Sequence, residues 1–241
     1  MLPLKDLNPT RRTPFITYIL IAVNVGVFLW MQLYTAVEQQ EFFLRLSIVP
    51  VNITENPLAL ETLLDITRSM FFHGGWVHLI GNMLYLWLFG DNVEDRMGVL
   101  LYLILYFLSG IVAATTQILI DPYSRIPLIG ASGAIGGILG AYLLLFPGVR
   151  VRGVIPLGRY GRVQDWPAWA VLGLWFVLQV VYGALSVFPA GGASGGVAFF
   201  AHIGGFVFGM LYAWIFMKLV PQPPAEQRRE VLYERADRYR Y

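Results

Sequence analysis

Residues 99–120, VLLYLILYFLSGIVAATTQILI, decide the class of this protein. This run of 22 residues contains no Asp, Glu, Lys or Arg. A helix needs about 20 apolar residues to cross the hydrocarbon core of a bilayer. The whole chain has the same character, because 57% of its 241 residues are hydrophobic, 13% are charged and the mean hydropathy is +0.61. A soluble domain carries about twice that charged fraction, so we predict a membrane protein.

Similar apolar runs recur on both sides of this segment. We predict six membrane-spanning helices, over residues 14–34, 70–90, 99–120, 132–147, 166–188 and 197–220. The runs lack the short alternating pattern of a membrane barrel, so the expected fold class is an all-α polytopic bundle. The membrane domain then covers residues 14–220, with an outer loop at 35–69, an N-terminal segment at 1–13 and a C-terminal tail at 221–241.

The lysines and arginines predict the orientation. With the N-terminus inside, 14 of the 17 Lys and Arg residues lie in inside segments, and only Arg45, Arg68 and Arg125 lie outside. Cytoplasmic loops are enriched in these residues, so we expect both termini inside a cell (plasma or inner) membrane. The net charge of +2 does not indicate a nucleic-acid partner, and the lack of cysteine excludes disulfides and a thiol nucleophile.

The outer loop leaves two interpretations open. Its segments FFLRL and LALETLLDI, within residues 42–66, are consistent with short helices lying on the membrane surface. A loosely ordered connector fits the same residues equally well. The sequence alone does not choose between them.

Four polar residues at membrane depth suggest a site. Spans two, four and six all run from outside to inside, so each begins at the outer end. His78 and Asn82 lie in span two, Ser132 opens span four and His202 lies near the start of span six. They therefore share one depth, roughly 5–10 Å below the outer surface at about 1.5 Å of rise per residue. Polar groups at such depth are costly and need a reason, so we expect one shallow site that opens outward.

Glycines follow both the serine and the last histidine at helical spacing. Gly136 lies one turn after Ser132, and Gly205 and Gly209 follow His202 on one face. Such glycine stripes let membrane helices approach closely. If the two stripes face each other, Ser132 Oγ comes within hydrogen-bond reach of the imidazole. A serine bonded to a neutral imidazole is the minimal activated nucleophile, here a dyad because no acid lies at that depth.

Each residue also has a plain structural interpretation. A serine in a membrane helix usually bonds a backbone carbonyl, and an asparagine such as Asn82 often joins two helices. A zinc site built from His73, His78 and His202 lacks a carboxylate ligand and any HExxH pattern, so we expect no metal. The joint occurrence of these groups at one depth favours chemistry. A second GASG, at residues 192–195, lies in a run of small residues and is interpreted as a linker.

Three segments carry a resemblance to a known family. MFFHGGWVHLIGNMLYLWLFGDNVEDRMG (70–98), GASGAIGGILGA (130–141) and AHIGGFVFG (201–209) resemble, in order, three alternate spans of the rhomboid intramembrane serine proteases. The match covers about residues 65–215. The resemblance implies hydrolysis of peptide bonds in or beside membrane segments of other proteins, without cofactor or metal.

The resemblance also implies roles for the site residues. Ser132 is the nucleophile and His202 the general base, while His78, Asn82 and the Ser132 backbone N–H support the oxyanion. Transmembrane protein substrates and the lipid bilayer are the implied partners. Span five and the 189–200 loop resemble the family's mobile gate and cap. One departure is Gly136, because some relatives carry an aromatic residue there that stacks on the histidine.

Two other functions remain as alternatives. A catalytically silent binder of membrane helices is one, although silent relatives typically lose the serine or the histidine, and both are present here. A small transporter is the other, but the inner halves of the spans carry no ionisable residue to line a path.

Overall fold

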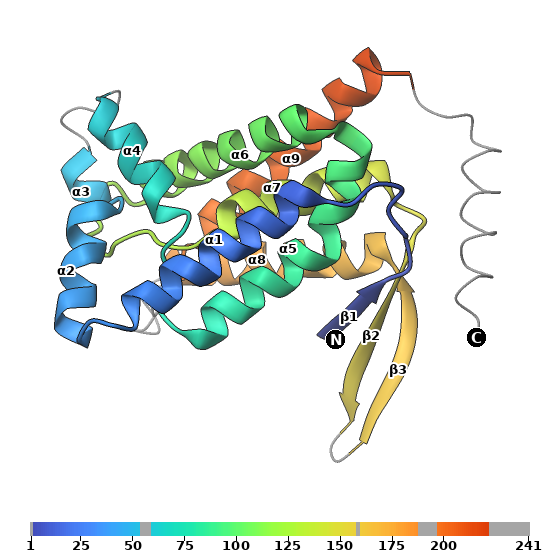
Figure 1. Cartoon of the computed structure of the whole chain (residues 1–241), viewed down its shortest axis with the longest axis horizontal. Helices are drawn as coiled ribbons and strands as arrows, with labels where there is room; N and C mark the ends of the chain where they lie inside the picture. Colours follow the sequence, from blue (N-terminus) through green and yellow to red (C-terminus); the bar gives the residue numbers. More distant parts are fainter. Residues whose placement is uncertain (1, 54–58, 158–159, 188–196, 222–241) are drawn as a thin grey trace.

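The computed structural model of the chain describes residues 2–53, 59–157, 160–187 and 197–221. Its elements, in chain order, are β1 (Leu2–Asp6), α1 (Phe15–Met31), α2 (Ala36–Leu46), α3 (Pro50–Ile53), α4 (Leu60–Ser69), α5 (Trp76–Met97), α6 (Val99–Ile120), α7 (Ser132–Leu145), β2 (Arg150–Leu157), β3 (Tyr160–Pro167), α8 (Ala168–Val187) and α9 (Phe199–Leu219). Helices α1 and α5–α9 lie along one another as a bundle, with α2–α4 at one end and β2 and β3 at the other (Figure 1).

Helix α7 forms the centre of this bundle. Every residue from Gly133 to Tyr142 is buried, and the helix packs against α5, α6 and α9. The main core gathers around it, with Leu105 of α6 and Phe206 of α9 almost fully enclosed. Because α7 begins at Ser132, the packing of this helix sets the depth of that serine.

The observed helices follow the predicted spans with one clear shift. Residues 99–120 form α6 over the predicted bounds, whereas span two, predicted at 70–90, forms α5 at Trp76–Met97. Its C-terminal end lies later because the helix continues through the polar run DNVED and stops only at Gly98. The φ of +79° at this glycine ends α5.

The described helices differ in how well they could cross a membrane. By length and composition, α6, α8 and α9 are long and apolar enough to do so. Helices α1 and α7 are apolar but shorter, at 17 and 14 residues. The chain is thus mostly helical and carries membrane-spanning segments.

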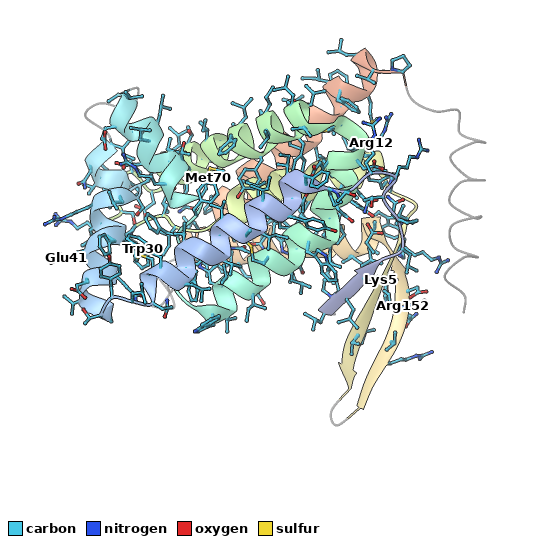
Figure 2. The ribbon with its side chains drawn as sticks, viewed as in Figure 1. Lys5, Arg12, Trp30, Glu41, Met70 and Arg152 are labelled. Atoms are coloured by element: carbon cyan, nitrogen blue, oxygen red, sulfur yellow. The ribbon has the colours of Figure 1, made fainter. Side chains whose placement is uncertain are left out.

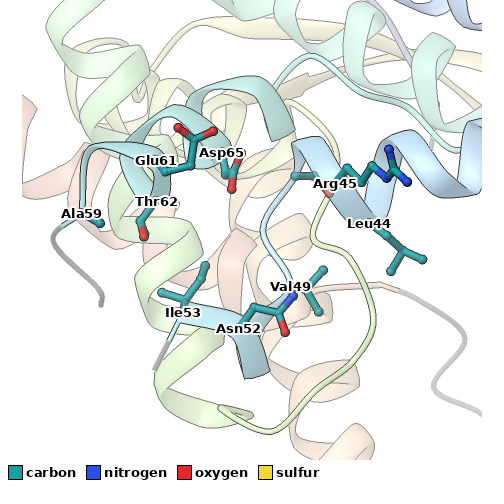
Figure 3. A pocket seen from close by; sticks show the side chains of 10 residues that line it. Leu44, Arg45, Val49, Asn52, Ile53, Ala59, Glu61, Thr62 and Asp65 are labelled. Carbon is teal, nitrogen blue, oxygen red and sulfur yellow. The ribbon is translucent and has the colours of Figure 1, made fainter. Parts of the chain in front are cut away.

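The described residues between α1 and α5 form three short helices, α2, α3 and α4. Thr35 and Glu38 form a reciprocal capping box at the start of α2. Ile48, Ile53 and Ile66 then pack together against α6. A cavity of about 320 Å³ lies between these short helices, with Arg45, Glu61 and Asp65 among the residues on its wall (Figure 3).

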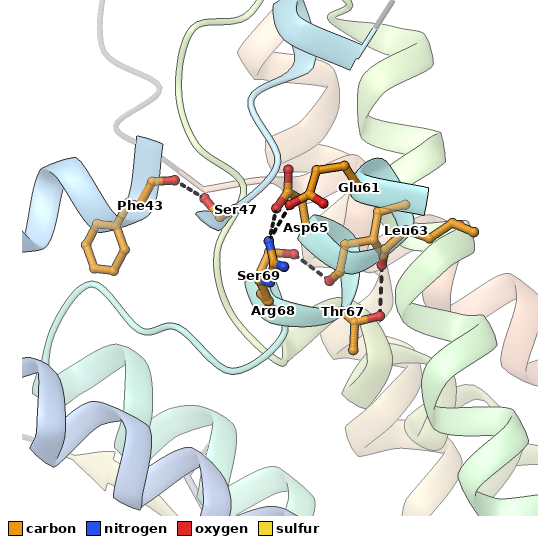
Figure 4. Close-up of polar contacts among 9 residues, drawn as sticks. Phe43, Ser47, Glu61, Leu63, Asp65, Thr67, Arg68 and Ser69 are labelled. Atoms are coloured by element: carbon orange, nitrogen blue, oxygen red, sulfur yellow. Dashed lines mark hydrogen bonds and ion pairs between the residues drawn. The ribbon is translucent and has the colours of Figure 1, made fainter. Parts of the chain in front are cut away.

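Polar contacts tie α4 together. The Nη1 of Arg68 contacts Glu61 Oε1 and Asp65 Oδ1, each at 2.9 Å (Figure 4). Thr67 Oγ1–H donates to the Leu63 carbonyl at 2.9 Å, and Ser69 Oγ–H donates to the Ile66 carbonyl at 2.7 Å. These bonds close the last turns of α4, which ends at Ser69, and the segment after it leads to α5.

The expectation of an all-helical chain needs one correction, since the chain also contains a three-stranded sheet in the order β1-β2-β3. Both strand pairs are antiparallel; β1 aligns Leu2 with Val154, and the β2–β3 hairpin aligns Arg150 with Pro167. β1 comes from the predicted N-terminal segment, and the hairpin fills the predicted connection between spans four and five. The β1–β2 pairing joins residues some 150 positions apart and so leaves little local signal, whereas the β2–β3 hairpin is local and was missed within the predicted connection.

The N-terminal segment is held by the polar end of α5 and by α7. Tyr142 and Asn92 donate to the Asp6 carboxylate at 2.7 and 2.8 Å. Burial raises the pKa of Asp6 well above its ordinary value, against the opposing effect of the bond from Tyr142. Glu94 accepts the Thr17 N–H at 2.7 Å and so satisfies a free amide in the first turn of α1.

Labelled side chains in Figure 2 show which residues lie at each end of the molecule. Lys5, Arg12 and Arg152 lie at the sheet end, whereas Trp30 and Glu41 lie at the end formed by α2 (Figure 2). Arg152 is paired there with Asp165 through Nε at 2.7 Å.

Candidate functional site

Ser132 is the first residue of α7, so the segment before it sets its position. Two backbone bonds from the α2–α4 region hold that segment: the Leu128 N–H donates to the Ile48 carbonyl at 2.7 Å, and the Gly130 N–H donates to the Ser69 carbonyl at 2.8 Å. Gly130 has a φ of +120°, which favours glycine. At the start of a helix, the Ser132 N–H is one of the amides without an intrahelical acceptor.

His202 lies in the first turn of α9, opposite Ser132. Its Nε2 is 2.7 Å from Ser132 Oγ, a hydrogen-bond distance. Both residues are half-buried, so the pair is covered by neighbouring helices without being sealed from the surroundings. The structure thus brings together the serine and the histidine that the sequence analysis paired.

Glycines allow α7 and α9 to come this close. A Cβ added at Gly205 would overlap the Gly133 carbonyl, and one at Gly209 would overlap the Gly137 carbonyl. A Cβ at Gly136 would stand 3.0 Å from the His202 carbonyl oxygen, which is tighter than ordinary contact. The two helices therefore meet backbone to backbone, and the Ser–His distance depends on that contact.

The polar side chains of α5 lie beside the segment that leads to Ser132. A Cβ at Gly130 would be 2.6 Å from His78 Nε2 and 3.6 Å from Asn82 Nδ2. Asn82 Nδ2 is buried and has no hydrogen-bond partner among the described residues. His73 stands apart: its ring lies 5.1 Å from that of His78, and its Nδ1 is 3.3 Å from the Phe71 carbonyl. Asn82 thus offers an unpaired donor beside Gly130, two residues before Ser132.

A family model described as the Rhomboid domain matches residues 61–219. This range includes the four predicted site residues, Ser132, His202, His78 and Asn82. The chain belongs to the rhomboid family. Three curated relatives show how similar the chain is to other members of the family. It is 28% identical over 236 residues to Rhomboid protein 1, mitochondrial, of Saccharomyces cerevisiae, covering 89% of this chain and 56% of that protein.

The other two relatives are bacterial and plant proteins. This rhomboid is 31% identical over 131 residues to Rhomboid protease GluP of Bacillus subtilis, covering 54% of this chain and 24% of that protein. It is 26% identical over 229 residues to Rhomboid-like protein 11, chloroplastic, of Arabidopsis thaliana, covering 93% and 72%. The chain spans about half of the yeast relative and about a quarter of the Bacillus one.

Two site residues of this rhomboid were missed by the sequence analysis, and both belong to α8. Gln179 Oε1 lies 2.8 Å from His202 Nδ1, and the ring of Trp175, one turn earlier, lies 6.0 Å from the imidazole ring at an angle of 36°. A signal was present, because an amide side chain in the middle of an apolar run needs a partner. The second GASG, at residues 192–195, lies outside the described residues.

The described part of this rhomboid contains no group of three or more His, Asp or Glu side chains that could hold a metal ion. The cavity between α2 and α4 has none of Ser132, His202, His78 and Asn82 on its wall. The described groups at the site are the Ser132 hydroxyl, the imidazoles of His202 and His78, and the Asn82 amide.

Proposed function

We propose that this rhomboid is an intramembrane serine endopeptidase that cleaves other membrane proteins in or beside their transmembrane segments. The observation that carries the proposal is the 2.7 Å contact between Ser132 Oγ and His202 Nε2 at the head of α7. A relative named as a protease, Rhomboid protease GluP, supports the reaction class. Serine chemistry of this kind needs no cofactor or metal.

The proposed reaction has two halves. Ser132 Oγ attacks the scissile carbonyl carbon as its proton passes to His202 Nε2. The imidazolium then gives that proton to the leaving amine as the C–N bond breaks, which leaves an ester on Ser132. Water, deprotonated by the same imidazole, hydrolyses the ester and returns the serine.

The oxyanion of each tetrahedral intermediate needs donors. The Ser132 N–H is suited because helix N-termini favour negative charge. Asn82 Nδ2 is suited because it is buried and unpaired among the described residues, so a new acceptor would satisfy it. His78, beside Gly130, is the third donor. Preorganised donors of this type are worth several kcal/mol in the transition state.

The proposed membrane arrangement has six spans, α1 and α5–α9, within residues 14–220, and both termini inside. Two observations support it. The Lys and Arg residues divide 14 to 3 between the proposed inside and outside segments. In addition, β1 pairs with β2, so the N-terminal strand and the hairpin after α7 share one side, as four crossings between them require.

This arrangement opens the site to the outer side of the membrane. Substrates would be transmembrane proteins whose helices unwind readily, since a carbonyl in an intact helix is already hydrogen-bonded. We propose α8 and the 189–200 segment as gate and cap, although residues 188–196 lie outside the described residues. The proposed location is the cell membrane; two of the relatives carry mitochondrial or chloroplastic names, and fractionation of cells expressing the chain would decide.

Purified variants test the proposal. We expect Ser132→Ala and His202→Ala to release no product from a tagged single-span protein, and a fluorophosphonate probe to label wild type at Ser132. Ser186→Ala is the matched control, because Ser186 Oγ–H donates to the Gly183 carbonyl of its own helix, at 2.7 Å. Undiminished cleavage by either dyad variant would overturn the proposal. Absent cleavage and labelling in wild type would favour the silent binder instead.

A further inference from the structure

We propose that helix α8 positions the imidazole of His202, with Gln179 selecting its tautomer and Trp175 covering its ring. Both residues act through the histidine and are positioning residues. This inference rests on the proposed function, but the tautomer of His202 can be measured whether or not the chain cleaves a substrate. If α8 positions His202, the Ser132–His202 dyad is active only while α8 covers the site.

Helix α7 cannot supply a ring that stacks on the histidine. The residue one turn after Ser132 is Gly136, where even a Cβ would stand 3.0 Å from the His202 carbonyl oxygen and 3.4 Å from the Phe206 nitrogen. A larger side chain there would push α9 away from α7. Close backbone packing thus brings the dyad together and at the same time excludes any ring stacked on the imidazole from this side.

Helix α8 supplies the missing contacts. Gln179 Oε1 lies 2.8 Å from His202 Nδ1, and the Trp175 ring lies 6.0 Å from the imidazole ring. Trp175 is also fixed from behind by Phe206, at 5.8 Å between ring centroids. The two residues are four apart, so they lie on one face of α8, and that face is the one turned to His202.

The contact with Gln179 determines which ring nitrogen carries the proton. An amide oxygen accepts, so Nδ1 bears the hydrogen, and Nε2 is left with the lone pair that takes the proton of Ser132. The opposite tautomer would place a hydrogen on Nε2, where it could only donate to Oγ. No hydrogen bond from an acid to His202 is present among the described residues, so Gln179 is the group that keeps the imidazole in the form needed for a general base.

Of the three helices long and apolar enough to cross a membrane, α6, α8 and α9, the least buried is α8. Of the 20 residues of α8, all described, only Ala168, Leu172 and Gly183 are buried. A sideways displacement of α8 would therefore break few apolar contacts, yet it would withdraw Gln179 and Trp175 from His202. We infer that the dyad is competent only while this face of α8 rests against the histidine.

The decisive experiment observes the tautomer without substrate. The chain has three histidines, so ¹⁵N-histidine NMR of the full chain in nanodiscs is readable, and a His202→Phe sample assigns the two signals of interest. In wild type at pH 7 we expect a protonated Nδ1 and an unprotonated Nε2. In Gln179→Leu we expect a mixture of both tautomers, and Gln179→Glu should restore the wild-type pattern by supplying an acceptor oxygen.

Kinetics give the second readout. Gln179→Leu should lower kcat about 100-fold, the size of effect expected when a reacting group is misplaced by about 1 Å, with KM unchanged. Leu178→Ala is the control, since Leu178 precedes Gln179 in the chain and lies on the exposed side of α8. A wild-type tautomer or wild-type kcat in Gln179→Leu would overturn the inference, as would a proton on Nε2 in wild type. If wild type cleaves nothing while the tautomer still responds to residue 179, the protease proposal fails and the positioning role stands.

Discussion

At the scale of single residues, Asn82 is informative because its amide nitrogen is buried without a partner among the described residues. Such a group lowers stability by roughly 1–3 kcal/mol relative to a satisfied one. A fold that keeps it has left a donor free for something that arrives later. Because Asn82 lies beside Gly130, two residues before Ser132, the acceptor that fits the proposed function is the oxyanion of a tetrahedral intermediate.

This interpretation predicts opposite behaviour for two buried asparagines. Asn82→Ala should lower kcat by about 10²–10³, the range for loss of one oxyanion donor, with little change in the free energy of unfolding. Asn24→Ala should do the reverse, because Asn24 Nδ2–H already donates to the Leu20 carbonyl at 2.7 Å, and the atom of Asn24 that is buried without a partner among the described residues is Oδ1, an oxygen that cannot donate to an oxyanion. Turnover numbers and denaturation in detergent measure both. An Asn82→Ala enzyme with wild-type kcat would contradict the donor role.

At the scale of elements, the contact between α7 and α9 sets the geometry of the dyad. Gly209→Ala places a methyl group against the Gly137 carbonyl, and overpacking of this kind typically costs 1–3 kcal/mol. We expect a matching loss of unfolding free energy together with reduced cleavage, because the Ser132–His202 distance must lengthen. Gly26→Ala in α1 is the control: nothing lies within 4 Å of its added Cβ, so stability and activity should be retained. Equal behaviour of the two variants would show that the close contact is not required.

Helix α8 can be locked in place by a single engineered bond. A Cβ at Gly183 would stand 3.3 Å from the Cβ of Phe199 on α9, close to the usual spacing of about 3.8 Å across a disulfide. The chain has no cysteine, so Gly183→Cys with Phe199→Cys gives one defined pair. We expect oxidation to suppress cleavage of transmembrane substrates, since they must pass α8, and dithiothreitol to restore it. The single variants serve as controls, and full activity of the oxidised pair would exclude α8 as the gate.

At the scale of the whole molecule, the proposed topology is open to a labelling test that also uses the absence of cysteine. Tyr123, between α6 and α7, is 80% exposed, and Val163, on β3, is 58% exposed. We expect Tyr123→Cys to react with a membrane-impermeant maleimide on intact cells and Val163→Cys to react only after permeabilisation. The reverse pattern would invert the topology, and labelling of both from outside would refute the six-span count.

Much of this architecture was accessible from the sequence because its signals are local. Apolar length and the absence of charge predicted α6 at its observed bounds. Span order and charge counting predicted the shared depth of Ser132, His202, His78 and Asn82. Glycines at spacings of three and four predicted a close helix contact beneath the serine. Each of these signals lies within one helix or in the flanks of a span.

The rest depended on contacts between distant segments, which no local pattern contains. The β1–β2 pair joins residues about 150 apart, and the Ser69–Gly130 bond joins the end of α4 to the segment before Ser132. The sequence analysis missed Gln179, the residue that contacts His202 Nδ1. In the sequence it is an isolated polar residue of an apolar run, and only packing shows that its face of α8 is turned toward α9. Hydrophobicity and local spacing thus determined that this is a helical membrane protein, and they predicted a serine and a histidine at one depth. Only the tertiary structure decided which helix orients the histidine, because that choice depends on how three helices rotate against one another.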